Sequence, residues 1–216
     1  EAGVPVVPGT KEPVYDAETG LKLAGEIGYP VMIKASSGGG GKGMRVAASE
    51  DEFEFQFNVA QRESANAFGD DTMYIERFVE NPRHVEIQIM ADKFGNVVAL
   101  GERDCSVQRN HQKLIEESPS PAITEETREK MNQYAVLAAK TVNYTNAGTI
   151  EFIVSPKGEF FFMEMNTRIQ VEHGVTEMVT GTDLIIEQIR VAMGLPLSFK
   201  QEDVKLRGHA IECRIN

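Results

Sequence analysis

The sequence predicts an α+β fold, because hairpin-like pairs of strands are mixed with helices instead of alternating with them. One pair is HVEIQIMADKFGNVVALGE, with a turn at residues 93–96, and another is TIEFIVSPKGEFFFMEMN, with a turn around residues 156–158. A third observation is a strand-like run on each side of the glycine loop in YPVMIKASSGGGGKGMRVA. Three antiparallel pairs argue against a doubly wound parallel sheet.

The other elements follow in chain order from hydrophobic periodicity and turn residues. DAETGLKLAGEIG predicts a helix closed by glycine, and a second helix runs from Ser49 to about residue 68. MYIERF then predicts a strand, and TEETREKMNQYAVLAAKTVN predicts an amphipathic helix after the first hairpin. GTDLIIEQIRVAMG predicts a helix that ends near Gly194, and GHAIECRI predicts a last strand.

A shift in composition at ENPRH predicts the boundary between two lobes. We expect residues 1–79 to form a linker and a small lobe that carries the glycine loop, and residues 80–216 to form a larger lobe. The chain begins at Glu1 and stops inside the strand-like ECRIN, so we expect a piece of a longer polypeptide.

Composition excludes several classes of function. The 22 Lys and Arg residues against 33 Asp and Glu residues give a net charge of -11, which argues against a nonspecific duplex-binding surface. Cys105 and Cys213 have no metal-type spacing, so we expect a reduced cytoplasmic protein without zinc. No apolar run approaches the roughly 18 residues that span a membrane. We therefore expect neither a nucleic acid nor a membrane as a partner.

The glycine loop raises the question of what lies so close to its backbone. Gly38, Gly40 and Gly43 satisfy the pattern of a dinucleotide-binding turn, but a strand follows where that turn requires a helix. A P-loop is excluded because Lys42 is followed by glycine and not by Ser or Thr. A glycine loop between antiparallel strands can instead fold its N–H groups over phosphates. Lys34, on the strand before the loop, could then reach a phosphate. The alternative is that the loop is only a flexible hairpin tip and that Lys34 faces solvent.

The second hairpin carries two candidate metal ligands. Glu151 and Glu164 each interrupt an apolar run, and the turn between them places them opposite one another. Opposed like charges destabilise a sheet, and buried carboxylates are rare unless they are paired or metal-bound. A hard cation would resolve this conflict, and Asn166 adds an oxygen ligand on the same face. The spacing alone equally allows one or both glutamates to face solvent.

Polar residues continue to alternate with apolar ones after Asn166, at Arg168, Gln170 and Glu172. If this segment stays extended, one face of it could bind a small anion at Arg168 and remove a proton at Glu172. A further polar cluster, ERDCSVQRNHQK, stands out in an acidic protein. By itself such a cluster is more typical of a solvated loop.

The chain resembles the biotin carboxylase family of ATP-grasp enzymes in five segments, which occur in the same order over nearly the whole chain. These segments are KASSGGGGKGM, ENPRHVEIQ, ERDCSVQRNHQK, MEMNTRIQVEH and GHAIECRIN. EESPSPA is most similar to the biotin carboxylase subunit of a bacterial acetyl-CoA carboxylase. Pyruvate and propionyl-CoA carboxylases share the domain, so the acyl acceptor is the less specific part of the resemblance.

The resemblance implies a ligase that phosphorylates bicarbonate with ATP and passes CO₂ from carboxyphosphate to biotin on a carrier protein. The residues implied in bicarbonate binding are Lys113, Arg168, Gln170 and Val171. Glu172 would take the proton of bicarbonate, and Arg214 would stabilise the biotin enolate. Mg²⁺ or Mn²⁺ would be held by Glu151, Glu164 and Asn166.

The nucleotide site is implied by the same resemblance. Its residues would be Lys34, Gly38, Gly39, Gly40, Gly41, Gly43, Met44, Glu76, Arg77, Phe78, Val79, His84, Gln108, His111 and Ile153. The implied partners are a biotin carboxyl carrier protein and carboxyltransferase subunits, within a pathway of fatty acid biosynthesis. The full-length protein would be a homodimer.

The chain departs from the family at Gly174, where a proline usually follows the Glu-His pair. Relative to the family, the predicted ATP-grasp fold is truncated at both ends, because an N-terminal domain with a further ATP-contacting lysine and additional C-terminal sheet are missing. The isolated fragment could therefore be inactive. Two alternatives remain open. One is another ATP-grasp ligase of the carbamoyl-phosphate type, which would share the glycine loop and the metal carboxylates but not the segment NTRIQVEH. The other is a noncatalytic nucleotide-binding fragment.

Overall fold

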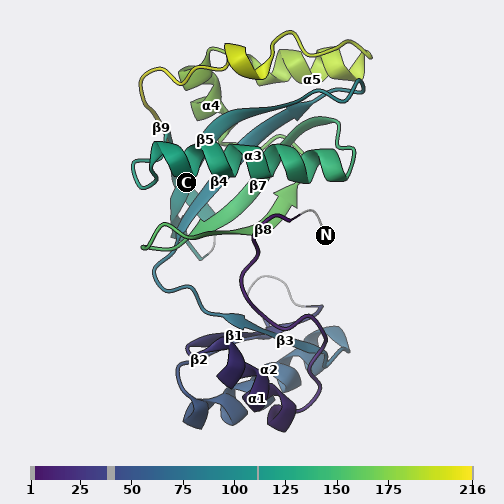
Figure 1. The fold of residues 1–216 in the computed structure, drawn as a ribbon, viewed down its shortest axis with the longest axis vertical. Helices are drawn as coiled ribbons and strands as arrows, with labels where there is room; N and C mark the ends of the chain where they lie inside the picture. Colours follow the sequence, from purple (N-terminus) through teal and green to yellow (C-terminus); the bar gives the residue numbers. More distant parts are fainter. Residues whose placement is uncertain (1–2, 38–41, 111, 216) are drawn as a thin grey trace. The chain divides into compact units, whose positions relative to one another are not determined.

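The computed structural model describes residues 3–37, 42–110 and 112–215. In this part of the chain, two antiparallel sheets carry packed α-helices, which confirms the predicted α+β fold class. The chain divides into two compact units. The small unit consists of residues 7–80, and the large unit joins residues 3–6 to residues 81–215. The elements of each unit are labelled in Figure 1.

The small unit is built on a three-stranded sheet with the strand order β2-β1-β3. Its strands are β1 (Val31–Ala35), β2 (Met44–Ala47) and β3 (Met73–Arg77). Two helices, α1 (Ala17–Ile27) and α2 (Glu50–Phe68), pack on this sheet. The strands β1 and β2 flank the glycine loop and pair antiparallel, as the sequence predicts.

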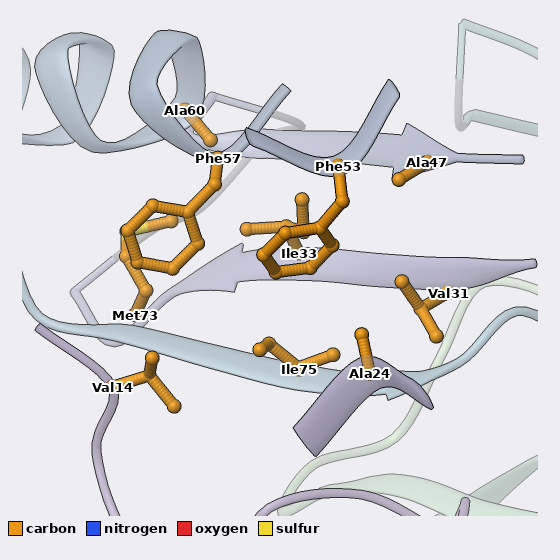
Figure 2. Packing of buried hydrophobic residues seen from close by; sticks show 10 residues of the cluster. All are labelled: Val14, Ala24, Val31, Ile33, Ala47, Phe53, Phe57, Ala60, Met73 and Ile75. Carbon is orange, nitrogen blue, oxygen red and sulfur yellow. The ribbon is translucent and has the colours of Figure 1, made fainter. Parts of the chain in front are cut away.

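The core of the small unit lies between the sheet and its two helices, as Figure 2 shows. Phe53 and Phe57 lie one turn apart on α2, and their ring centroids are 5.7 Å apart. Because side chains alternate along a strand, Lys34 and Glu76 lie on the opposite face of the sheet. The buried residues of the core are Val14, Ala24, Val31, Ile33, Ala47, Phe53, Phe57, Ala60, Met73 and Ile75.

A six-stranded antiparallel sheet with the strand order β8-β7-β4-β5-β6-β9 forms the described large unit. Its strands are β4 (Arg83–Ala91), β5 (Val97–Arg109), β6 (Gln112–Ser118), β7 (Asn146–Val154), β8 (Phe160–Asn166) and β9 (Ala210–Cys213). The hairpins β4–β5 and β7–β8 turn where the sequence predicts turns. Pairing of β4 with β7 joins both hairpins into one sheet.

The two faces of the large sheet are covered by different helices. The helix α3 (Glu125–Thr141) packs on the face where Val85 and Ile87 of β4 are buried. The helices α4 (His173–Thr180) and α5 (Leu184–Ala192) contact the sheet on its other face. No helix in the described ranges is both long enough and apolar enough to span a membrane.

Two local expectations from the sequence are wrong. The described residues of the polar cluster are not a solvated loop, because β5 continues to Arg109 and β6 begins at Gln112. The segment after Asn166 does not stay extended, because β8 ends there and α4 begins at His173. Pairing of β8 with β7 stops at Asn166, so this pairing does not hold residues 167–172 extended.

Candidate active site

A row of charged residues crosses four strands of the large sheet. Cross-strand pairs join Arg103 of β5 to Glu86 of β4, Glu86 to Glu151 of β7, and Glu151 to Glu164 of β8. The last pair confirms that the second hairpin places its two glutamates opposite one another. Glu86 and Arg103 are fully buried, so their charges need partners within the protein.

Lys113 of β6 supplies one such partner. Its ammonium lies 2.5 Å from Glu86 Oε2, 2.8 Å from Glu151 Oε1 and 2.9 Å from Glu172 Oε1. Burial disfavours the ammonium form, but Glu86 and Glu151 outweigh burial and raise the pKa of Lys113 above its usual range. The structure therefore places the Lys113 ammonium against three carboxylates.

Glu172 lies between two cations at the start of α4. Its Oε1 accepts from Lys113, and its Oε2 accepts from Arg214 at 2.9 Å. Burial would raise the pKa of this carboxyl, but the Lys113 ammonium outweighs burial and lowers that pKa. Arg214 also lies 2.7 Å from the buried carboxylate of Glu116. Glu172 is therefore ionised and faces a lysine and an arginine.

Glu151 has further partners besides Lys113. Its Oε2 lies 2.9 Å from His84 Nε2, and His84 Nδ1 lies 3.1 Å from Gln108 Nε2. Burial would raise the pKa of Glu151, but the hydrogen bond and charge of His84 and the charge of Lys113 hold that pKa far below its usual range. Ile153 is the cross-strand neighbour of His84. These predicted nucleotide and metal residues thus form one connected group.

The predicted metal ligands meet through Asn166. Its Nδ2 lies 2.9 Å from Glu151 Oε1 and 3.3 Å from Glu164 Oε1, so one amide bridges two carboxylates. Turning the amide over would exchange its N–H donors for an oxygen. Three oxygens around one point are the kind of donor set that Mg²⁺ and Mn²⁺ accept. The residues present therefore fit a hard divalent cation.

A second group of ligand-type atoms lies close by. One atom each of His84, Glu86 and Glu151 fall within 4.8 Å of one another. Glu86 is already paired with both Arg103 and Lys113, so this carboxylate has two cations without a metal. We assign no ion to this second group.

The remaining predicted bicarbonate residues lie in the segment between β8 and α4. Gln170 is buried and donates to Glu151 Oε1 at 3.0 Å, whereas Val171 is exposed. Arg168 is exposed and donates to the carbonyl of Ile169. No carboxylate in the described part of the chain pairs with Arg168, so this guanidinium is available to an anion.

The small unit holds the predicted phosphate and adenine residues. Lys34 Nζ lies 2.8 Å from Glu76 Oε1 on the open face of the sheet. Gly43 has a φ of +70° and donates to Glu63, and Met44 begins β2. The other predicted residues of this unit follow Glu76 along the chain, namely Arg77, Phe78 and Val79. The predicted residues Gly38, Gly39, Gly40, Gly41 and His111 lie outside the described residues.

Four charged or polar residues of this face were given no role by the sequence analysis. They are Glu86, Gln88, Arg103 and Glu116, and all four are buried. One signal was available in HVEIQI, where polar residues alternate with apolar ones over His84, Glu86 and Gln88. Arg103 belongs to the polar cluster ERDCSVQRNHQK, but its partners lie on other strands and on α4, so that cluster could not indicate them. No local signal marks Glu116, whose partner Arg214 follows β9.

Comparison with known proteins gives the family. Residues 1–200 match the family model described as "Carbamoyl-phosphate synthase L chain, ATP binding domain". A curated relative is a biotin carboxylase of Nostoc sp., which is 62% identical over 216 residues, with 100% of this chain and 48% of the relative covered. The chain therefore spans about half the length of the curated relatives it matches.

Solved structures agree with this result. A biotin carboxylase from Campylobacter jejuni, described as a complex with β,γ-ATP, has a TM-score of 0.89 and 54% identity over 99% of this chain and 48% of its own. The biotin carboxylase domain of 2-oxoglutarate carboxylase from Hydrogenobacter thermophilus has a TM-score of 0.88 and 51% identity over 99% of this chain and 47% of its own. This chain has the ATP-grasp fold of these biotin carboxylases and belongs to the family of the carbamoyl-phosphate synthase L chain ATP-binding domain.

Proposed function

We propose that the protein containing this chain is a biotin carboxylase, which uses ATP and bicarbonate to carboxylate biotin on a carrier protein. The observation that carries this proposal is the contact of Lys113 with Glu172, whose other oxygen contacts Arg214. This arrangement puts an ionised carboxylate between two cations, next to a segment that resembles the bicarbonate-binding segment of the family. The curated relatives and structural neighbours that are biotin carboxylases support the same reaction.

Bicarbonate is an anion, so its site needs cations or N–H donors. We assign this role to Lys113, Arg168, Gln170 and Val171. Arg168 is suited to it because no carboxylate in the described ranges pairs with its guanidinium. A neighbour from Hydrogenobacter thermophilus is described as a complex with bicarbonate and MgADP, which supports an anion site in this family.

Glu172 is the proposed base of the first step. It takes the hydroxyl proton of bicarbonate, the freed oxygen attacks the γ-phosphorus of ATP, and ADP leaves. The product, carboxyphosphate, then breaks down to CO₂ and phosphate. Phosphate can take the proton from N1′ of biotin, and CO₂ adds at that nitrogen. Arg214 would hold the oxygen of the biotin enolate, on which negative charge develops.

The nucleotide contacts are assigned by the resemblance alone. Lys34 and residues 38–43 would hold the phosphates, together with Met44, and residues 76–79 and Ile153 would contact the adenine. His84, Gln108 and His111 would complete the nucleotide contacts. Glu151, Glu164 and Asn166 would hold Mg²⁺ or Mn²⁺, which neutralises phosphate charge when bound.

The final acyl acceptor is a finer proposal. The segment EESPSPA resembles acetyl-CoA carboxylase, so we propose acetyl-CoA as the acceptor and a cytoplasmic enzyme of fatty acid synthesis. The proposed partners are a biotin carboxyl carrier protein and carboxyltransferase subunits. One structural neighbour is the corresponding domain of a 2-oxoglutarate carboxylase, described as a dimer. This neighbour supports a homodimer. Another structural neighbour is the biotin carboxylase subunit of a pyruvate carboxylase, so the domain by itself does not specify the acceptor.

Bicarbonate-dependent ATP hydrolysis by the intact protein tests this function. We expect hydrolysis to require Mg²⁺ and bicarbonate and to increase with free biotin. Replacing Arg168 by Ala or Glu172 by Gln should abolish it with little change in ATP affinity, because both residues act on the second substrate. Glu117→Gln is the matched control, since Glu117 pairs with His209 at the surface and has no assigned role.

The same assay separates the alternatives. Stimulation by ammonium in place of biotin would indicate a ligase of the carbamoyl-phosphate type. ATP binding without any bicarbonate-dependent hydrolysis by the intact protein would leave only a noncatalytic nucleotide-binding protein. If Glu172→Gln lost ATP binding while bicarbonate dependence persisted, Glu172 would belong to the nucleotide site.

A further inference from the structure

Arg103 is the largest fully buried side chain of the protein that the structure describes, and its guanidinium is completely hydrogen-bonded. Its Nε donates to Glu86 at 2.6 Å. Its Nη1 donates to Gln88 at 2.6 Å and to Thr176 at 3.0 Å. Its Nη2 donates to Thr149 at 3.2 Å and to Gln170 at 3.1 Å. Arginine has five N–H donors, so every one of them has an acceptor.

The bond to Gln170 decides which way its side-chain amide points. Gln170 Oε1 accepts from Arg103, and Gln170 Nε2 donates to Glu151 at 3.0 Å. The opposite orientation would turn an N–H toward the guanidinium and an oxygen toward the Glu151 carboxylate. Both contacts would then be repulsive, so the pair of neighbours selects a single orientation.

This orientation matters for a bound anion. The amide nitrogen of Gln170 carries two hydrogens, and the carboxylate of Glu151 accepts one of them. The second N–H has no acceptor in the described part of the chain. An anion such as bicarbonate can accept a hydrogen bond from this N–H, whereas the amide oxygen would repel it.

We propose that Arg103 is a positioning residue for the anion site, because it holds Gln170 with its N–H donors directed to bicarbonate. The proposal rests on the proposed function for the identity of the anion. The same guanidinium also orients Glu86, whose second oxygen accepts from Lys113 at 2.5 Å. Arg103 therefore acts on two of the four assigned bicarbonate residues without touching the substrate.

The conservative change Arg103→Lys keeps the charge but supplies only three donors without the planar fork. We expect the KM for bicarbonate in the intact enzyme to rise about 10- to 100-fold. Replacing a residue that positions a binding group typically has effects of this size. The KM for MgATP should change less than about twofold, since none of the five residues that accept hydrogen bonds from Arg103 is assigned to the nucleotide or to the metal.

Arg128→Lys is the matched control. Arg128 pairs with the buried carboxylate of Glu102 through two nitrogens, so its replacement also breaks a buried arginine pair in the large unit. The contacts described for Arg128 are with Glu102 and Glu125, and neither of these is an assigned site residue. A purely structural role of Arg103 predicts similar changes of both KM values in the two variants, whereas the positioning role predicts a bicarbonate effect only for Arg103→Lys.

A second measurement does not depend on activity. In protein with ¹⁵N-labelled glutamine, the side-chain signals of Gln170 can be assigned by their loss in Gln170→Ala. We expect one N–H to be protected from exchange by Glu151 in the native protein, and this protection to be lost in Arg103→Lys. If Arg103→Lys does not fold, Thr149→Val can be used instead. It removes the Thr149 hydroxyl that accepts from Arg103 Nη2, the nitrogen that also donates to Gln170, and we expect a smaller loss of protection of the Gln170 N–H.

The outcomes distinguish this proposal from the proposed function. A native enzyme without bicarbonate-dependent hydrolysis overturns the function, and the glutamine signals still report whether Arg103 orients Gln170. A folded Arg103→Lys variant with an unchanged KM for bicarbonate and unchanged Gln170 signals would overturn the positioning role. Equal increases in the KM for bicarbonate and for MgATP would also contradict it.

Discussion

Lys113 neutralises more buried negative charge than any other side chain in the described site. Three carboxylates converge on its ammonium, and two of them, Glu86 and Glu151, are directly opposed on neighbouring strands. Opposed like charges in a sheet are destabilising unless a cation lies between them. A residue assigned to bicarbonate binding therefore also holds the site together.

Replacing Lys113 by Met should destabilise the large unit by about 3–5 kcal/mol, because it leaves buried carboxylates without their cation. Urea unfolding of the variant measures this loss. Lys130→Met is the control, since Lys130 pairs with Glu126 at the surface and should cost less than about 1 kcal/mol. Equal losses in the two variants would contradict the structural role of Lys113.

The pKa of Lys113 also predicts a pH dependence. Glu86 and Glu151 outweigh burial and raise this pKa in the folded protein. The stability that Lys113 contributes is therefore fully present below the unfolded pKa of about 10.4 and is lost as the pH rises toward the folded pKa. Between pH 10 and 11 the wild type should therefore lose stability relative to Lys113→Met. Urea unfolding at several pH values measures this as a shrinking difference between the two midpoints. A constant difference over that range would contradict the prediction.

At the scale of elements, Gly43 shows why a glycine directly precedes the strand β2. Its φ of +70° lies in the left-handed region, and an added Cβ would lie 2.7 Å from Ala35 Cβ on β1. Its carbonyl accepts the N–H of Ala35, next to the last paired residues of β1 and β2, so the close approach lies at the end of that pairing. Only glycine fits this position without moving a strand.

Gly43→Ala should destabilise the small unit by about 2–4 kcal/mol, as the sum of left-handed strain and overpacking. Gly95→Ala is the control, because Gly95 has a φ of +88° but no atom within 4 Å of an added Cβ. It should cost only about 1–2 kcal/mol from the backbone term. Thermal unfolding compares them, and equal shifts would mean that the contact with Ala35 relaxes freely.

The turn between β4 and β5 depends on Asp92. Its Oδ1 accepts from the N–H groups of Phe94 and Asn96, and its Oδ2 accepts from Asn96 Nδ2 and from the N–H of Leu197. Burial would raise the pKa of Asp92, but these hydrogen bonds together lower it. The ionised form therefore connects the hairpin to the segment after α5.

Asp92→Asn should cost about 1–3 kcal/mol at pH 7, because an amide has one oxygen and leaves N–H groups without an acceptor. The folded pKa of Asp92 is lowered, so its contribution is present above the unfolded pKa of about 3.9 and is lost as the pH falls toward the folded pKa. The difference between wild type and variant should shrink below pH 4 in urea unfolding. Asp71→Asn, an exposed control, should show no such trend.

At the scale of the whole molecule, the proposed function predicts that nucleotide stabilises the protein. A ligand at 100 times its dissociation constant adds about 2.7 kcal/mol of stability. We expect MgATP to raise the Tm and ATP with EDTA to raise it less. Glu164→Gln should remove the Mg²⁺-dependent part while leaving the Tm without nucleotide unchanged, because Glu164 is exposed. Unchanged Mg²⁺-ATP affinity in this variant would contradict the metal assignment.

The α+β class, the two hairpins and the opposition of Glu151 and Glu164 could be predicted from the sequence, since each depends on contacts between residues close in the chain. Alternation of polar and apolar residues and turn residues carry that information. The five ordered motifs also predicted the family, which the comparisons confirm.

Which buried charges meet could not be predicted from the sequence, because it depends on the order of the strands in the folded sheet. The sheet places β4 between β5 and β7, so Glu86 and Glu151 face each other although a long stretch of chain separates them. Lys113 reaches its carboxylates across sequence separations of 27, 38 and 59 residues. Strand order depends on which faces pack together over the whole core, and no local pattern records it. Arg103 and Gln170, 67 residues apart, meet for the same reason.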